Sequence, residues 1–193
     1  MASKRVPPKP AARPAASDAS LERAHGAFRD GDVGGALAIA SQILSRDPVN
    51  PDALLLASQC HSLQGRFDRA VAFDRRAVEA HPENPQAWMT LAFDLANMGD
   101  MEGAEESYRR AVELDPKRAS AWYRLACIAA RRGDIEEALA HLEKASAESP
   151  EYREEAKSQP EFAALLEDPR FLRIVSGAKD SDDPYADWMR SKT

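Results

Sequence analysis

Apolar residues recur along this chain at helical spacing, in paired blocks separated by a short polar step. One block has apolar side chains at positions i, i+3, i+4 and i+7, which places them on one face of an α-helix. Its members are Trp88, Leu91, Ala92 and Leu95. A second block follows with a similar stripe, made of Met101, Ala104, Tyr108 and Ala111. The pattern predicts two helices joined by a tight turn at Gly99 and Asp100.

The same arrangement returns every 34 residues. The prolines on this period are Pro48, Pro82, Pro116 and Pro150, the glycines are Gly31, Gly65, Gly99 and Gly133, and the alanines are Ala36, Ala70, Ala104 and Ala138. Three residue types on one period indicate an internal repeat, in which each unit buries its second face only by stacking on a neighbour.

The residues between the blocks have the chemistry of helix ends. Gly99 suits the position after a helix that needs φ > 0, and Asp100 can cap the next helix. Asn84-Pro85, like Asn50-Pro51, is typical of an N-cap followed by proline at the first helical position. Alanines at the inner positions allow two helices to approach closely. Trp88 and Trp122 are expected to be buried between helices.

The pattern W-x2-L-A…G-D…A-x3-Y-x2-A…P resembles the tetratricopeptide repeat (TPR) family, whose unit has 34 residues. The resemblance covers residues 17–150 and implies an all-α fold, a right-handed superhelical solenoid of four helix-turn-helix repeats. In the 34-residue register these are 17–50, 51–84, 85–118 and 119–152. The first repeat departs from the pattern at Ser20, Arg23 and Ile43. Asp74 stands where an aromatic residue is usual, with Phe73 beside it, and predicts local irregularity there.

Residues 151–175 contain no fifth copy and are expected to form a C-terminal helical cap. A helix is predicted from Glu151 to Lys157, interrupted at Pro160, with a last turn opening at Pro169. The apolar residues expected to cover the fourth repeat are Phe162, Leu165, Leu166, Phe171 and Ile174. An uncovered array would expose apolar surface, so such a cap is physically required.

The two ends of the chain differ in kind. Residues 1–16 are rich in proline and alanine, with four basic residues and no acid, which predicts a disordered arm dispensable for folding. Residues 176–193 form a polar tail with an aromatic short motif of Tyr185, Trp188 and Met189 at i, i+3 and i+4. This motif is expected either to dock on the array's own apolar surface or to reach a partner.

Composition narrows the function. The net charge of -6 argues against a dedicated nucleic-acid binder. No stretch has the length and hydropathy of a membrane span, and the basic N-terminus has no apolar core of a signal peptide. Cys60 and Cys127 suggest no disulfide framework, so a reducing, cytoplasmic setting is expected.

The residues offer little catalytic chemistry. The four histidines do not stand at metal-ligand spacings, and no phosphate-binding glycine loop or nucleophile elbow is present. We therefore predict no catalytic residue, no cofactor and no metal. The doublets Arg75-Arg76 and Arg109-Arg110 lie one repeat apart. Because Glu105 and Glu106 precede the second doublet by four residues, intrahelical ion pairs on a solvated face are expected.

The resemblance implies that the first helix of each repeat lines a peptide-binding groove. The candidate groove residues are Leu21, His25 and Phe28 from the first repeat, Leu55, Gln59 and Leu63 from the second, Gln86, Met89, Phe93 and Asn97 from the third, and Tyr123, Cys127 and Arg131 from the fourth. Five of them are expected to form an exposed apolar file, namely Leu21, Leu55, Met89, Phe93 and Tyr123. An exposed apolar strip of this kind marks an interaction site.

The sequence lacks the Lys and Asn residues with which some TPR proteins clamp acidic chaperone tails; only Arg124 matches. The leading hypothesis is a non-catalytic adaptor that binds an apolar or amphipathic peptide or helix of a partner protein. One alternative is a small TPR chaperone for secreted or membrane-inserting proteins. A further alternative is an enzyme with a site between the array and the cap.

Overall fold

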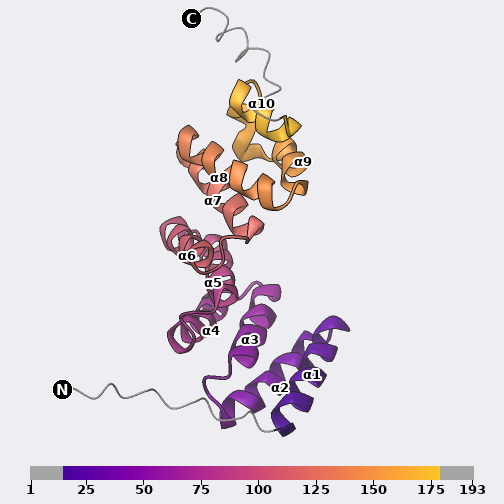
Figure 1. The fold of residues 1–193 in the computed structure, drawn as a ribbon. Coiled ribbons are helices and arrows are strands. Elements are labelled where there is room, and N and C mark those ends of the chain that lie inside the picture. Colours follow the sequence, from indigo (N-terminus) through magenta and orange to yellow (C-terminus); the bar gives the residue numbers. More distant parts are fainter. Residues whose placement is uncertain (1–14, 179–193) are drawn as a thin grey trace, which may run out of the picture. The chain divides into compact units, whose positions relative to one another are not determined.

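The fold was analysed in a computed structural model of the 193-residue chain, which describes residues 15–178. Throughout that range the regular structure is helical, and no strand occurs in it (Figure 1). The chain divides into two compact units, residues 1–80 and 81–193. The predicted all-α class is confirmed.

The first unit holds two helix pairs. Their helices are α1 (Ala15–Arg29) with α2 (Val33–Arg46), and α3 (Pro51–Leu63) with α4 (Phe67–Ala80). The members of each pair pack on each other, and α2 also packs on α3. Because α1 begins at Ala15, two residues expected to belong to a disordered arm are helical. Residues 1–14 lie outside the described part of the chain.

The second unit holds two further pairs and the C-terminal cap. The pairs are α5 (Pro85–Met98) with α6 (Met101–Leu114), and α7 (Ala119–Arg132) with α8 (Ile135–Glu148). The cap consists of α9 (Glu151–Ser158), the 3-10 helix η1 (Pro160–Leu165) and α10 (Pro169–Ser176). α6 packs on α7, η1 packs on α7, and α10 packs on α8 and α9.

The turns inside the third and fourth helix pairs have the predicted chemistry. Gly99 ends α5 with φ +89°, a left-handed conformation that glycine adopts without steric cost. Asp100 then accepts a hydrogen bond from the Gly103 amide at 2.9 Å, which satisfies one free N–H of the α6 N-terminus. Gly133 and Asp134 repeat this arrangement between α7 and α8.

Small residues fill the centre of every pair. The four alanines on the repeat period, Ala36, Ala70, Ala104 and Ala138, are fully buried. A methyl group at this place lets the paired helices come close, whereas a larger side chain would overpack the contact.

Two expectations about the pairs are wrong. Trp88 and Trp122 are only partly buried, because each ring lies at the edge of its pair with its indole N–H donating to a proline carbonyl, Pro82 and Pro116 respectively. Helix α4 runs without a break through Asp74, so the predicted irregularity does not occur. Asp74 is itself buried, and its neighbour Phe73 stacks on His61 instead of replacing it.

The cap covers the fourth repeat with aromatic side chains. Phe162 and Phe171 are fully buried and their ring centroids are 5.8 Å apart. Leu165 and Val175 are buried with them, and Ile174 packs against the same cluster. The expectation that Leu166 belongs to this set is wrong, because it is the residue after η1 and is exposed.

Candidate functional site

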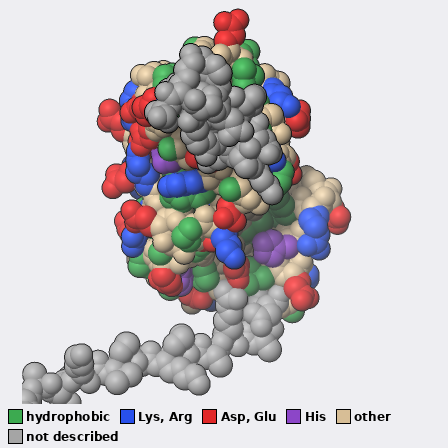
Figure 2. Space-filling view, turned by 45° about the horizontal axis from the view of Figure 1, so that its top comes forward, with side chains coloured by type: hydrophobic (Ala, Val, Ile, Leu, Met, Phe, Trp, Pro, Cys, Tyr) green, Lys and Arg blue, Asp and Glu red, His purple; other side chains and the backbone are tan. Residues whose placement is uncertain are grey.

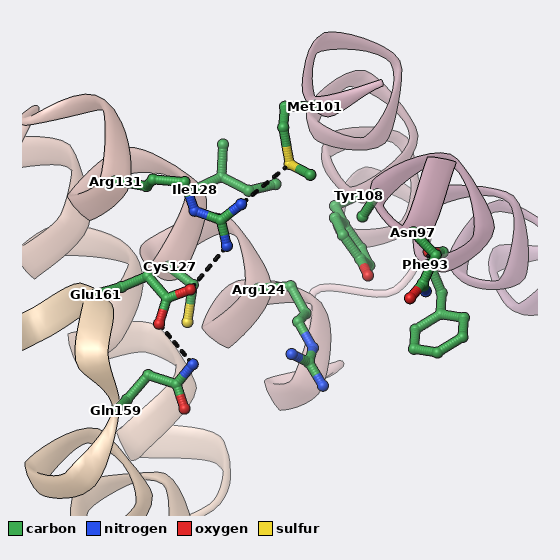
Figure 3. Close-up of a pocket in the computed structure, with 11 residues that line it drawn as sticks. Phe93, Asn97, Met101, Tyr108, Arg124, Cys127, Ile128, Arg131, Gln159 and Glu161 are labelled. Carbon is green, nitrogen blue, oxygen red and sulfur yellow. Dashed lines mark hydrogen bonds and ion pairs between the residues drawn. The ribbon is translucent and has the colours of Figure 1, made fainter. Parts of the chain in front are cut away.

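A pocket of about 230 Å³ lies within the second unit, between the third repeat, the fourth repeat and the cap. We call it the inter-repeat pocket (Figure 3). The third repeat contributes Phe93, Ala96 and Asn97 from α5 with Met101 and Tyr108 from α6. The fourth contributes Arg124, Cys127, Ile128 and Arg131 from α7, and the cap contributes Gln159 and Glu161.

The apolar part of the pocket includes an unusually exposed aromatic ring. Phe93 is 46% exposed on α5, whereas Leu91 and Leu95, on the face of the same helix that packs within the pair, are buried. Met101 and Ile128 are partly buried and line the same pocket. A large apolar side chain left in water beside a concavity is a feature of interaction sites.

The wall nearest the cap is a fixed polar chain. Arg131 forms an ion pair with Glu161 at 2.7 Å, and Glu161 also accepts a hydrogen bond from Gln159 at 2.7 Å. Arg131 reaches the Met101 sulfur at 3.5 Å as well. Burial would raise the pKa of Glu161, but the hydrogen bonds from Arg131 and Gln159 outweigh it and lower that pKa. Glu161 therefore stays ionised and neutralises Arg131.

Arg124 is different, because its positive charge has no such partner. Among residues 15–178 its guanidinium takes part in no hydrogen bond or ion pair, and its side chain is exposed. Figure 3 shows it beside Tyr108 and Cys127, on the lining of the pocket. Burial raises the pKa of Tyr108 to about 12 while Arg124 opposes that rise. The pocket thus combines exposed apolar surface with one uncompensated cation.

Cys127 lines the pocket but does not have the properties of a reactive thiol. It is 5% exposed, and burial raises the pKa of its thiol to about 12. A reactive cysteine needs a lowered pKa and solvent access. Its role here is that of a small apolar wall residue.

Four of the predicted groove residues meet in this pocket, namely Phe93, Asn97, Cys127 and Arg131. Gln86 and Met89 lie on the same helix α5 but outside the pocket lining, and Gln86 accepts a hydrogen bond from Arg118 at 2.7 Å. The expectation that Tyr123 is exposed is wrong. It is 1% exposed, because Tyr152 stacks on it at 4.6 Å and Phe162 packs beside it.

The predicted groove residues of the first two repeats belong to the first unit. Leu21 is buried, which contradicts its place in an exposed apolar file. His25, Phe28, Leu55 and Gln59 are partly buried, and Leu63 is exposed at the end of α3. The tail motif of Tyr185, Trp188 and Met189 lies outside the described residues.

The inward positions of the first helices did not predict every residue of the pocket. Met101 and Tyr108 come from the second helix of the third repeat, and Gln159 and Glu161 come from the cap. The repeat register carries no signal for the cap residues, since the cap is not a copy of the repeat. The sequence singles out Arg124 only as an isolated match to a clamp position.

Charged residues elsewhere in the second unit pair with one another. Arg109 contacts Glu105 at 2.7 Å, as the spacing predicts, and also Glu137 of α8. Arg110 pairs with Glu113 at 2.8 Å, so the predicted pairing with Glu106 is replaced by one three residues later. Acidic and basic side chains are interspersed on the face seen in Figure 2. This distribution favours a solvated charged surface over a phosphate-binding stripe.

No group of three or more His, Cys, Asp or Glu side chains in residues 15–178 could hold a metal ion. No helix in that range combines the length and apolar character needed to cross a membrane.

Successive helix pairs, each closed by a left-handed glycine, define a helical-repeat protein. Two sequence profiles described as tetratricopeptide repeat match residues 27–93 and 89–153. The chain belongs to the tetratricopeptide repeat family. None of the curated proteins matches the sequence.

Solved structures show the same fold. A crystal structure of MamA superposes with a TM-score of 0.72 at 19% identity, covering 83% of this chain and 90% of that one. MamA 41-end from Desulfovibrio magneticus RS-1 has a TM-score of 0.63 at 18% identity, covering 70% and 76%. YrrB, described as a TPR protein with an unusual peptide-binding site, has a TM-score of 0.66 at 19% identity, covering 90% and 91%.

Proposed function

We propose that this protein is a non-catalytic adaptor that binds an apolar or amphipathic peptide or helix of a partner protein in the inter-repeat pocket. The observation that carries the proposal is the 46% exposed ring of Phe93 in a pocket that also holds the unpaired charge of Arg124. Family membership supports it, as does the fold shared with YrrB, whose description names a peptide-binding site.

The two features select a ligand of mixed character. A bulky apolar side chain of the ligand gains by covering Phe93 and Met101, because apolar area leaves water on both sides. A polar or acidic group next to it can face Arg124, which has several unused N–H donors. A short amphipathic helix supplies both kinds of group from one face, with anchors at i, i+3 and i+4.

Affinity capture from the native lysate tests the proposal. The parent protein is compared with a Phe93→Glu, Arg124→Glu variant, which places two negative charges in the pocket. Leu172→Glu is the matched control, because Leu172 is 49% exposed on α10 and lies outside the pocket. Tyr123 is unsuitable for substitution, because a charge at a fully buried position would unfold the repeat.

The expected result is a protein captured by the parent and the control but lost with the double variant. The captured protein is then purified and titrated, and its affinity for the double variant should fall by at least about 30-fold, the loss typical of an interface hot spot. Circular dichroism must show equal helicity in all three proteins. Equal affinity for all three would exclude this pocket as the binding site.

A further inference from the structure

A second cavity, of about 390 Å³, lies between α8 and the cap and shares no lining residue with the inter-repeat pocket. We call it the cap cavity. The lining residues that matter here are Glu143 and Ser146 of α8, Arg153 of α9, Arg173 of α10, and Gly177 and Ala178 at the end of α10. Two arginines against one glutamate give its lining an excess of positive charge.

Arg153 uses very little of its hydrogen-bonding capacity. A guanidinium carries five N–H donors. Within residues 15–178, Arg153 donates one long hydrogen bond, from Nη2 to the Ser146 carbonyl at 3.4 Å, and forms no ion pair. Its Nε is buried without a hydrogen-bond partner in that range. An arginine that is partly removed from water without a partner carries an uncompensated desolvation cost.

Ser146 adds a second unsatisfied group at the same cavity. Its side chain is 3% exposed, and its Oγ has no hydrogen-bond partner among the described residues. Buried polar atoms in folded proteins nearly always have a partner. Two such donors at one cavity suit a group that accepts hydrogen bonds. A carboxylate fits an arginine best, because its two oxygens can accept two parallel N–H bonds.

The backbone at Gly177 is shaped around the Arg153 guanidinium. Gly177 has φ +71°, and a Cβ built there would lie 2.4 Å from Arg153 Nη1. The positive φ favours glycine here, and a side chain at this position would displace the end of Arg153. The turn also fixes where the chain leaves α10, because Ala178, the next residue, lines the cap cavity.

We propose that the cap cavity binds carboxylate groups of the chain's own acidic segment, residues 180–183, which reads Asp-Ser-Asp-Asp. A residue spans at most about 3.6 Å, so the Cα of Asp180 stays within about 7 Å of the Cα of Ala178 at the cavity. Asp182 and Asp183 follow within a few residues. The segment thus carries negative charge to the rim of a positively charged cavity without any long linker.

The C-terminal end of α10 is the other source of negative charge near Arg153, because the last carbonyls of a helix carry a partial negative charge. It does not satisfy the arginine. The Arg173 and Ile174 carbonyls accept from the Gly177 amide at 3.1 and 3.2 Å, and Arg153 donates to neither. A carboxylate next to Arg153 would supply a full negative charge, whereas the carbonyls at the end of α10 carry only a partial one.

Hydrogen exchange of the full chain tests this assignment. The parent is compared with a variant carrying Asp180→Asn, Asp182→Asn and Asp183→Asn. Asp187→Asn is the matched control, since it removes a charge from the same tail beyond the proposed segment. Amides of residues 178–183 should exchange at least about fivefold faster in the triple variant than in the parent or the control, because a docked segment opens less often. High salt should bring the parent close to the triple variant.

A double-mutant cycle that combines Arg153→Gln with the triple substitution tests whether Arg153 is the partner of residues 180–183. In that background the triple substitution should no longer change the exchange rates. If Arg153→Gln fails to fold, the tail variants still decide the matter. Equal exchange in the parent and the triple variant would overturn the proposal. The proposal would also be overturned if added inorganic phosphate slowed exchange at the cap cavity as strongly in the parent as in the triple variant. The occupant of the cavity would then be an external anion.

Discussion

The third and fourth repeats differ most at one equivalent position. Phe93 and Cys127 stand one repeat apart on the first helices of their pairs, α5 and α7. Phe93 is 46% exposed, whereas Cys127 is 5% exposed. The larger and more apolar side chain is thus the one left in water. Burial at this position is decided by what lies over the helix, and only the fourth repeat has the cap over it.

The preceding equivalent pair shows the same contrast. Met89 is partly buried, while Tyr123 is almost completely buried under Tyr152 and Phe162. The cap therefore covers this face of α7 in the fourth repeat and does not cover the equivalent face of α5 in the third. The inter-repeat pocket lies where the cap ends. Its lining comes from the third repeat on one side and from the fourth repeat and the cap on the other.

Removing the central ring of the cap should have the largest effect. Phe162 is fully buried between Tyr123 and Phe171, so Phe162→Ala should lower the free energy of unfolding by about 3–5 kcal/mol. Urea unfolding followed by circular dichroism measures this. Leu166→Ala in the same cap is the control, since Leu166 is exposed and should change stability little. Equal losses in the two variants would show that the cap does not cover the fourth repeat.

Trp122→Ala should have the next largest effect, a loss of about 2–3 kcal/mol. The ring is only partly buried, so the loss falls below the range for fully buried tryptophan. It packs against the core cluster of the fourth repeat, and the Lys144 Nζ lies 4.1 Å from its centroid. Trp122→Phe separates the ring from the indole N–H that donates to Pro116 at 2.8 Å. Thermal melts of both variants check this, and an unchanged melting temperature for Trp122→Ala would contradict it.

The dependence of the free energy of unfolding on pH should reveal the burial of Cys127, with a smaller effect. Burial raises the pKa of Cys127 to about 12, well above the value of a free thiol. The unfolded chain therefore loses the thiol proton at a lower pH than the folded chain does. The folded state keeps its full stability with respect to this group below about pH 8.5, and the free energy of unfolding falls as pH rises above that value. Between pH 8 and 10 the loss should be about 1–2 kcal/mol.

Cys127→Ala is the control for that titration, because it removes the thiol while Cys60 and the tyrosines continue to titrate in both proteins. The parent should lose more stability than the variant over the same pH range in urea unfolding. Parallel pH profiles for the two proteins would mean that Cys127 is not buried in solution.

The exposed position should give the smallest change. Phe93→Ala should alter the free energy of unfolding by no more than about 0.5 kcal/mol, because the ring makes few buried contacts. Its effect belongs to binding instead. A loss of several kcal/mol in urea unfolding would show that Phe93 is packed in solution, and the contrast with Cys127 would disappear.

The repeat explains why so much of the fold could be predicted. Each helix pair is joined at a glycine with positive φ, and three of the four have a capping aspartate after it, such as Asp100 and Asp134, so the copies reinforce the prediction for one another. Local capping and a 3.6-residue periodicity are properties that a sequence displays directly. The helix bounds follow from them.

The candidate site was less predictable, because its burial depends on contacts distant in sequence. Met89 and Tyr123 are both large side chains at matching positions of the repeat, and nothing local to either one shows that the cap covers only Tyr123. Glu161 neutralises Arg131 from 30 residues away, whereas Arg124 has no ion-pair partner within residues 15–178. Such pairings are set by how the non-repeating cap packs on α7, which no periodicity encodes.

The aromatic rings over Tyr123 also limit how this family member can lengthen during evolution. A fifth helix pair added after α8 would need the place that Tyr152, Phe162 and Phe171 already fill. A duplicated pair inserted after residue 118 would instead meet the same Trp, Ala and Gly positions that its neighbours present. New repeats can thus be accommodated between existing ones. The cap can then stay unchanged and continue to pack on the last repeat.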